Sequence, residues 1–119
     1  MKTTKKDFDL FKKECRKWID IIGLKDWHIW YEHTPTERHC IAQYDLDDAG
    51  RSCVIYFTTG LDGEKLDRHD ICSAAFHEII EIYMRDLRRM AMTSYSYDLV
   101  DSETHKIVRM LENVLFPKY

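Results

Sequence analysis

The sequence predicts a single α+β domain in which helices pack against one small sheet. Apolar residues recur with helical spacing near both ends, and three short runs rich in β-branched and aromatic residues lie between them. The 119 residues are 45% hydrophobic and include only four Gly and two Pro. A chain of this size and composition is expected to form one domain over residues 1–119, with enough apolar mass for a core.

The first predicted element is an amphipathic helix that begins near Asp7. Its apolar residues recur every three or four positions, which places them on one face of a helix: Phe8, Phe11, Cys15, Trp18, Ile19 and Ile22. Gly23 follows the last of them, and glycine is the residue that most often ends a helix. We therefore predict that this helix stops at Gly23.

Three strands are predicted next, over residues 27–31, 40–44 and 52–58. Turn-forming residues at 34–36 and 47–50 separate them, and both connections are short enough for neighbouring antiparallel strands. The expected sheet is thus a three-stranded antiparallel meander. The third run is the most continuous, so it is expected to be the most buried or the best paired.

A long helical stretch is predicted from about Asp67 or Asp70, either of which can cap it, to about Met90. Between residues 71 and 84 the residues are apolar or small almost all the way round, which is typical of a buried central helix. This stretch contains the segment AFHEIIEIYM, residues 75–84, in which polar residues interrupt the apolar pattern.

The interrupting residues include His77, Glu78 and Glu81, and a bound metal ion would explain them. A buried carboxylate without a partner costs several kcal/mol or takes up a proton. His77 and Glu81 are four residues apart and share one face of the helix, whereas Glu78 lies about 100° round the axis. This spacing suits two metal ligands and a general base that reaches a water molecule on the metal.

A third protein ligand is expected from a closing helix over residues 101–115. The choice of ligand types favours His105, because two histidines and one carboxylate form a donor set used by zinc hydrolases. The periodicity of the helix favours Glu103, which shares a side with Ile107 and Val114. His105 is the preferred third ligand, and Glu103 is kept as the alternative.

The order of elements and the HExxE segment at 77–81 resemble the zincin metallopeptidases, particularly minimal SprT-like and ImmA/IrrE-like domains. The chain resembles small phage-encoded metallopeptidases more closely. It shares with them a GL-x-x-W motif at residues 23–27 and a motif similar to H-x-x-V-x-R-x-L-E at residues 105–112. The resemblance spans most of the chain. It implies a zincin-like fold, a zinc ion held by His77 and Glu81 with His105 as a candidate third ligand, and Glu78 as general base. Glu81 departs from the family pattern, which has histidine there.

The function expected from these features is hydrolysis of peptide bonds by a zinc-activated water, with a peptide or protein as substrate or partner. The third strand is expected to provide the edge along which an extended peptide pairs. Two alternatives remain open: an inactive zincin-fold binding module that acts through Trp27, Trp30 and Tyr31, and a purely structural metal site.

Composition argues against other classes of function. The net charge is −3 and no basic block stands out, so nucleic-acid binding is not expected. No apolar run approaches the roughly 18 residues that cross a membrane. The four cysteines form no CxxC pair and are expected to be reduced, which suits a cytoplasmic protein, in the host cytoplasm if the protein is phage-encoded.

Overall fold

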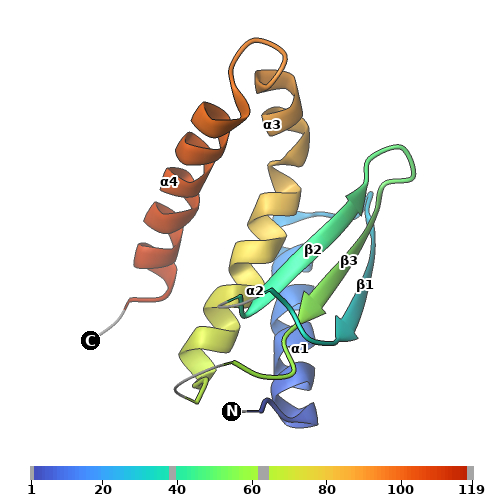
Figure 1. The fold of residues 1–119 in the computed structure, drawn as a ribbon, viewed down its shortest axis with the longest axis vertical. Helices are drawn as coiled ribbons and strands as arrows, with labels where there is room; N and C mark the ends of the chain where they lie inside the picture. The colour runs from blue at the N-terminus through green and yellow to red at the C-terminus, as the bar shows by residue number, and fades with distance from the viewer. Residues whose placement is uncertain (1, 38–39, 62–64, 118–119) are drawn as a thin grey trace.

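The computed structural model describes residues 2–37, 40–61 and 65–117, which form four helices and a three-stranded sheet (Figure 1). In chain order the elements are α1 (Lys5–Ile22), β1 (His28–His33), β2 (Ala42–Asp47), β3 (Ser52–Phe57), α2 (Arg68–Tyr83), α3 (Arg85–Ala91) and α4 (Tyr97–Leu115). The predicted α+β class is therefore confirmed, as is the order of a helix, three strands and further helices.

Helix α1 ends at Gly23 as predicted, but it begins at Lys5, two residues before the predicted start near Asp7. The Thr4 side chain accepts a hydrogen bond from the backbone of Asp7, and the Asp7 side chain accepts one from the backbone of Thr4, which forms a capping box. Gly23 ends the helix with φ 76°, a left-handed conformation that glycine adopts without steric cost. Phe11 and Cys15 are completely buried and carry the inner face of α1 into the core.

The sheet is mixed, with the strand order β1–β3–β2, so the predicted antiparallel meander is wrong. β2 pairs antiparallel with β3, and the predicted turn at residues 47–50 does join them as a hairpin. β1, however, pairs parallel with β3, with Ile29 opposite Cys53. The connection after β1 therefore carries the chain past β3 to the far edge of the sheet, where β2 lies.

The strand order follows from which strand is the most apolar. Cys53, Ile55 and Phe57 of β3 are almost completely buried and alternate along the strand, so the central position covers them best. Turn-forming residues indicate how long a connection is, but they do not decide which strands become neighbours. The prediction that the third strand is the most buried is confirmed. Its expected role as a peptide-pairing edge is wrong, because β3 is paired on both sides and β2 is an edge strand.

Helix α2 lies in the middle of the molecule, with α4 on one side and the sheet on the other (Figure 1). Asp67 caps its first turn, and Ile71, Ala75 and Ile79 are among the residues it buries, which confirms the prediction of a central helix. The predicted stretch to Met90 is two helices rather than one. The chain bends at Met84, where φ is −87° and ψ is 0°, and α3 begins at the next residue.

Helix α4 begins at Tyr97, four residues before the predicted start, because Ser96 caps it. The residues that α4 buries are Val100, Thr104 and Val108. Val108 belongs to a second, smaller core with Phe76 and Ile80 of α2, against which Trp18 and Phe116 pack. This contact holds α4 against α2 and so determines which side of α4 faces the HExxE segment.

Two expectations about the chain as a whole can be compared with the structure. All four cysteines are free thiols, and Cys15, Cys53 and Cys72 are buried, as the widely spaced pattern indicates. Across the described ranges, none of the helices combines the length and the apolar character needed to cross a lipid bilayer.

Candidate metal centre

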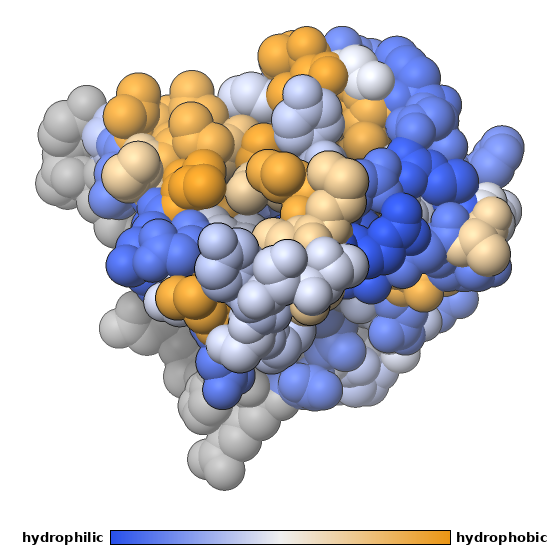
Figure 2. Space-filling view, turned by 90° about the horizontal axis from the view of Figure 1, so that it is seen from above, coloured by the Kyte–Doolittle hydropathy of each residue, from blue (hydrophilic) through white to orange (hydrophobic). Residues whose placement is uncertain are grey.

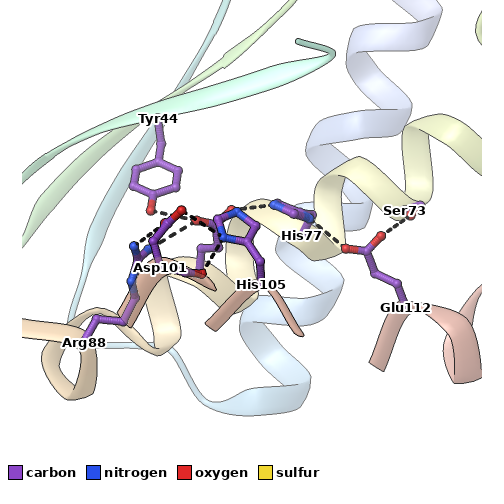
Figure 3. Close-up of polar contacts among 8 residues, drawn as sticks. Tyr44, Ser73, His77, Arg88, Asp101, His105 and Glu112 are labelled. Carbon is purple, nitrogen blue, oxygen red and sulfur yellow. Dashed lines mark hydrogen bonds and ion pairs between the residues drawn. The ribbon is translucent and has the colours of Figure 1, made fainter. Parts of the chain in front are cut away.

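Helices α2 and α4 bring His77, Glu81 and His105 together. Figure 3 shows His77 and His105 close to one another. Each residue offers one ligand atom, and these atoms lie within 4.8 Å of one another. His77 and Glu81 are one turn apart on α2, and their Nε2 and Oε2 atoms are 2.5 Å apart. His105 faces them from α4, with its ring centroid 5.9 Å from that of His77.

Burial and charge couple His77 to Glu81. Burial alone would lower the pKa of His77, but the hydrogen bond and negative charge of Glu81, together with the hydrogen bond to Glu112, raise that pKa to about 9. Burial alone would raise the pKa of Glu81, but its hydrogen bond to His77 and the nearby positive charges hold that pKa below its ordinary value. Without a metal, the two residues therefore form an imidazolium–carboxylate pair.

A carboxylate from the far end of α4 orients the His77 ring. Oε1 of Glu112 lies 2.7 Å from Nδ1 of His77, and the Ser73 hydroxyl donates to the other oxygen of Glu112 at 3.3 Å. A partner on Nδ1 leaves Nε2 pointing toward Glu81 and His105, which is how metal-binding histidines are commonly held. The sequence analysis missed Glu112. The only sequence feature that could have indicated Glu112 is its position seven residues after His105, which places it two turns along the same side of α4.

The second oxygen of Glu81 is held by residues outside the HExxE segment. Oε1 of Glu81 lies 3.3 Å from the Tyr44 hydroxyl and 3.4 Å from Nη1 of Arg88. Arg88 is only 5% exposed and also donates to Asp101 at 2.8 Å. These contacts fix the orientation of Glu81 and leave Oε2 to face His77. No sequence motif indicates Tyr44 or Arg88, because they come from β2 and α3.

The ring of His105 is held by the residue one turn before it. Its Nδ1 lies 2.8 Å from the backbone carbonyl oxygen of Asp101 and 3.4 Å from the Asp101 carboxylate. The tautomer that carries its proton on Nδ1 satisfies both contacts, and it places the lone pair on Nε2. His105 can therefore offer Nε2 as a metal ligand.

The alternative third ligand, Glu103, lies outside this cluster. Its side chain is 58% exposed and pairs with Lys106 at 2.9 Å. Glu103 shares a side of α4 with Ile107 and Val114, as the periodicity indicated, but both of those residues are exposed. That side is thus the outer face of the helix, and the inner face presents His105 to α2.

Glu78 lines a cleft of about 400 Å³ beside the cluster, together with Ala42, His77 and Glu112. It is only 7% exposed, and it has no hydrogen-bond or ion-pair partner among the described residues. Burial, and next the negative charge of Glu81, raise the pKa of Glu78 to about 8. A carboxyl group with a pKa in this range, open to a cleft, is suited to accept and return a proton near neutral pH.

The donor set and the charge of the site both suit a divalent metal. Two imidazole nitrogens and one carboxylate oxygen are the protein ligands of many catalytic zinc sites, in which a fourth position stays open. Glu81 and Glu112 also place two carboxylates beside His77, the Glu78 carboxyl group lies next to them, and all three are at least partly buried. A dication would compensate this concentration of negative charge and would replace the proton on His77.

A second group of possible ligands lies at the start of α2: Asp67, His69 and Asp70. The Asp67 carboxylate accepts a hydrogen bond from the backbone of Asp70, and the Asp70 carboxylate accepts one from the backbone of Asp67. The capping box of α2 therefore accounts for both carboxylates. We do not assign a metal to this group.

Comparisons with protein-family models, with curated proteins and with solved structures found no match for this chain. The function of the cluster is therefore inferred from its own geometry and chemistry.

Proposed function

We propose that this protein is a zinc-dependent hydrolase of the peptidase type, with His77, Glu81 and His105 as metal ligands and Glu78 as general base. One observation carries the proposal. Three ligand atoms from two helices lie within 4.8 Å of one another, next to a buried carboxylate that faces a cleft and has no partner among the described residues.

The neighbours of the three ligands support the same assignment. Each ligand has a second contact that orients it: Glu112 on His77, Arg88 and Tyr44 on Glu81, and Asp101 on His105. Such outer contacts hold ligands in place before the metal arrives and reduce the cost of ordering them on binding. A purely structural zinc site would be closed by four protein ligands, whereas the described residues bring three together here.

In the proposed reaction, water adds to the carbonyl carbon of a peptide bond and the bond to nitrogen breaks. Glu78 accepts the proton that the water loses and delivers it to the nitrogen of the departing amine. Bound zinc would supply Lewis acidity, which lowers the pKa of water and polarises the carbonyl. Burial assists Glu78, because a carboxylate held away from solvent is a stronger base than an exposed one.

The substrate is expected to lie along the outer edge of β2. β3 occupies the other edge of β2, and the cleft beside Glu78 is lined by Ala42, the first residue of β2, and by Ile41 just before it. An extended peptide that adds to this edge would pair through its backbone, which gives affinity without requiring one particular side chain. Tyr44, on the same strand, already contacts Glu81, so this edge leads directly to the proposed metal ligands.

The alternative function, a binding module that acts through Trp27, Trp30 and Tyr31, has weaker support. Trp27 is 6% exposed and belongs to the core, whereas Trp30 is 56% exposed. Trp27, Trp30 and Tyr31 do line one hollow of about 460 Å³, but Trp27 contributes mainly to the core there. Metal binding without hydrolysis would favour a binding or structural role over catalysis.

The proposal is tested by metal content and by cleavage in the same preparation. Elemental analysis after purification without chelator, followed by zinc titration, should find one zinc per chain, and His77→Ala should lose it. Unstructured peptides incubated with the zinc-loaded protein should show new termini by mass spectrometry. Glu78→Gln should keep the zinc and lose the cleavage. Near-zero zinc content, with no rise in melting temperature when zinc is added, would refute the metal site.

A further inference from the structure

Most of the large hydrophobic residues that are exposed lie in one stretch of the chain, from the end of α2 to the end of α4. Of the thirteen large hydrophobic residues that are exposed, eleven lie within residues 83–115, and only Ile21 and Trp30 lie elsewhere in the described chain. Figure 2 looks down on the end of the molecule where α3 and α4 meet and shows apolar side chains gathered there. Scattered exposed apolar residues are ordinary, but a concentration of this kind indicates an interaction surface.

The surface has two parts, a groove and a ridge. The groove lies between α3 and α4 and has a volume of about 460 Å³, with walls that include Leu87, Tyr95, Leu99 and Ile107. The ridge continues along α4 beyond the end of α3. Its Met110 and Val114 are 63% and 77% exposed, and they follow Ile107 by three and seven residues, on the same side of the helix.

Helix α4 therefore has two packing faces. The inner face is buried against α2 through Val108 and its neighbours. The outer face is a stripe formed by Leu99, Glu103, Ile107, Met110 and Val114. Steps of four, four, three and four residues are the spacing of a helix that packs lengthwise against another helix. α3 flanks only the first part of this stripe, across the groove, and the described chain places no helix over Met110 and Val114, which lack the partner that the spacing indicates.

We propose that a second copy of this chain covers the groove and the ridge, in a symmetric dimer with antiparallel α4 helices. Area supports this choice. A fully buried aromatic side chain covers about 150–250 Å² and the aliphatic groove and ridge residues cover less, so these half-exposed residues together offer at most on the order of 700 Å². This upper bound lies at the top of the roughly 300–600 Å² range of the largest patch on a typical monomer, close to the ~800 Å² that each partner contributes to a standard interface.

Symmetry supports it as well. In a two-fold dimer, the ridge of each copy must enter the groove of the other, and this requires the α4 helices to run antiparallel. In an antiparallel pair of identical helices, the residue numbers of any two facing residues add up to the same value. If Met110 faces Leu99 of the second copy, then Lys106 faces Glu103, and Val114 lies opposite the segment before α4 that contains Tyr95.

The charges agree with this register. Lys106 and Glu103 already pair within one chain at 2.9 Å, so the dimer would bring two such pairs together near the axis, with opposite charges facing each other across the interface. Both ends of each ridge would meet apolar groove residues. One register thus satisfies both the apolar and the charged positions. The dimer does not depend on the proposed zinc chemistry.

Sedimentation equilibrium of the full chain, from low to high micromolar concentration, tests the dimer. The wild type should pass from monomer to dimer, and Met110→Glu or Val114→Glu should raise the dissociation constant at least about tenfold. Ile21→Glu is the matched control, because Ile21 is 63% exposed on α1, and it should leave the constant unchanged. A chain that stays monomeric throughout would overturn the proposal, as would a dimer that Met110→Glu leaves intact.

A charge exchange tests the register. Glu103→Lys and Lys106→Glu should each weaken the dimer, because each places like charges opposite one another. The double variant, Glu103→Lys with Lys106→Glu, should restore the dissociation constant to within a few-fold of the wild type. A double variant as weak as the two single variants would show that these residues do not face each other, and the antiparallel register would be wrong.

Discussion

Nδ1 of His77 lies 2.7 Å from Oε1 of Glu112, a contact that joins the HExxE helix to the far end of α4. Thirty-five residues separate the two in the sequence. The contact orients the imidazole so that Nε2 faces Glu81 and His105. A zinc site built here would therefore depend on how α4 packs as much as on the helical segment that carries the motif.

Removing this orienting contact should weaken metal binding without removing a ligand. We expect Glu112→Ala to lower zinc affinity about 10–100-fold, the effect typical of outer-sphere partners of metal-binding histidines. Glu112→Gln should recover part of the loss, because its amide oxygen still accepts a hydrogen bond from Nδ1. Isothermal titration with a competing chelator measures both, and Glu103→Gln, an exposed carboxylate on the same helix, is the control. Equal affinities in all four proteins would rule out a positioning role.

The third ligand can be identified by comparing two alanine variants. His105→Ala should reduce zinc affinity by more than Glu103→Ala does, because His105 lies in the cluster and Glu103 is exposed on the outer face of α4. The same titration gives the ranking. The reverse order would mean that the helix turns its other face to α2 in solution.

Glu81 has a structural role as well as its proposed role as a ligand, because it pairs with the buried Arg88. Glu81→Ala should therefore destabilise the metal-free protein by about 2–3 kcal/mol, somewhat less than the full cost of breaking a buried ion pair, since Asp101 still pairs with Arg88. Chemical denaturation in the presence of chelator measures this change. Glu81→Gln should cost less, because its amide oxygen can still accept from Arg88. A Glu81→Ala variant as stable as the wild type would show that Arg88 gains little from Glu81.

Replacing Glu81 by histidine tests its proposed role in catalysis. Glu81→His should keep the metal, since both side chains can bind zinc from a helix. It should also increase any peptidase activity, because a neutral ligand leaves the metal a stronger Lewis acid. Cleavage rates measured at equal zinc occupancy give the answer, with Glu78→Gln as the inactive reference. If neither Glu81→His nor Glu81→Ala changes zinc content or melting temperature, Glu81 is not a ligand.

The stability of the metal-free protein should fall as the pH rises from about 4.5 to about 9. The pKa of His77 is raised from 6.5 to about 9, so its stabilising charge is fully present below pH 6.5 and is lost as the pH passes through 9. The pKa of Glu78 is raised from 4.5 to about 8, so folding increasingly opposes its ionisation over that interval. Both groups therefore act in the same direction.

Melting temperatures measured with chelator across this pH range test the sum of the two effects. Glu78→Gln should flatten the part of the curve between pH 4.5 and 8 and should raise the melting temperature at pH 8. Zinc binding should release protons, and zinc affinity should rise with pH until His77 is neutral. A melting temperature that rises between pH 6 and 9 in the metal-free protein would contradict this account.

The sequence by itself determined the local elements and the arrangement within α2. A capping box at Thr4 and Asp7 and a glycine at 23 bound the first helix, and both act through hydrogen bonds and dihedral angles within a few residues. The spacing of His77, Glu78 and Glu81 on one helix is likewise a local property, because 3.6 residues per turn decides which of them share a face.

Only the tertiary structure decided the strand order and the surroundings of the metal ligands. Glu112 and Arg88 reach the cluster because α4 and α3 pack where they do, and no local pattern records that packing. The choice between His105 and Glu103 shows the physical reason. Both sides of α4 carry apolar residues, so helical spacing alone does not tell which side is buried. The contact between Val108 and Phe76 buries the side that carries His105.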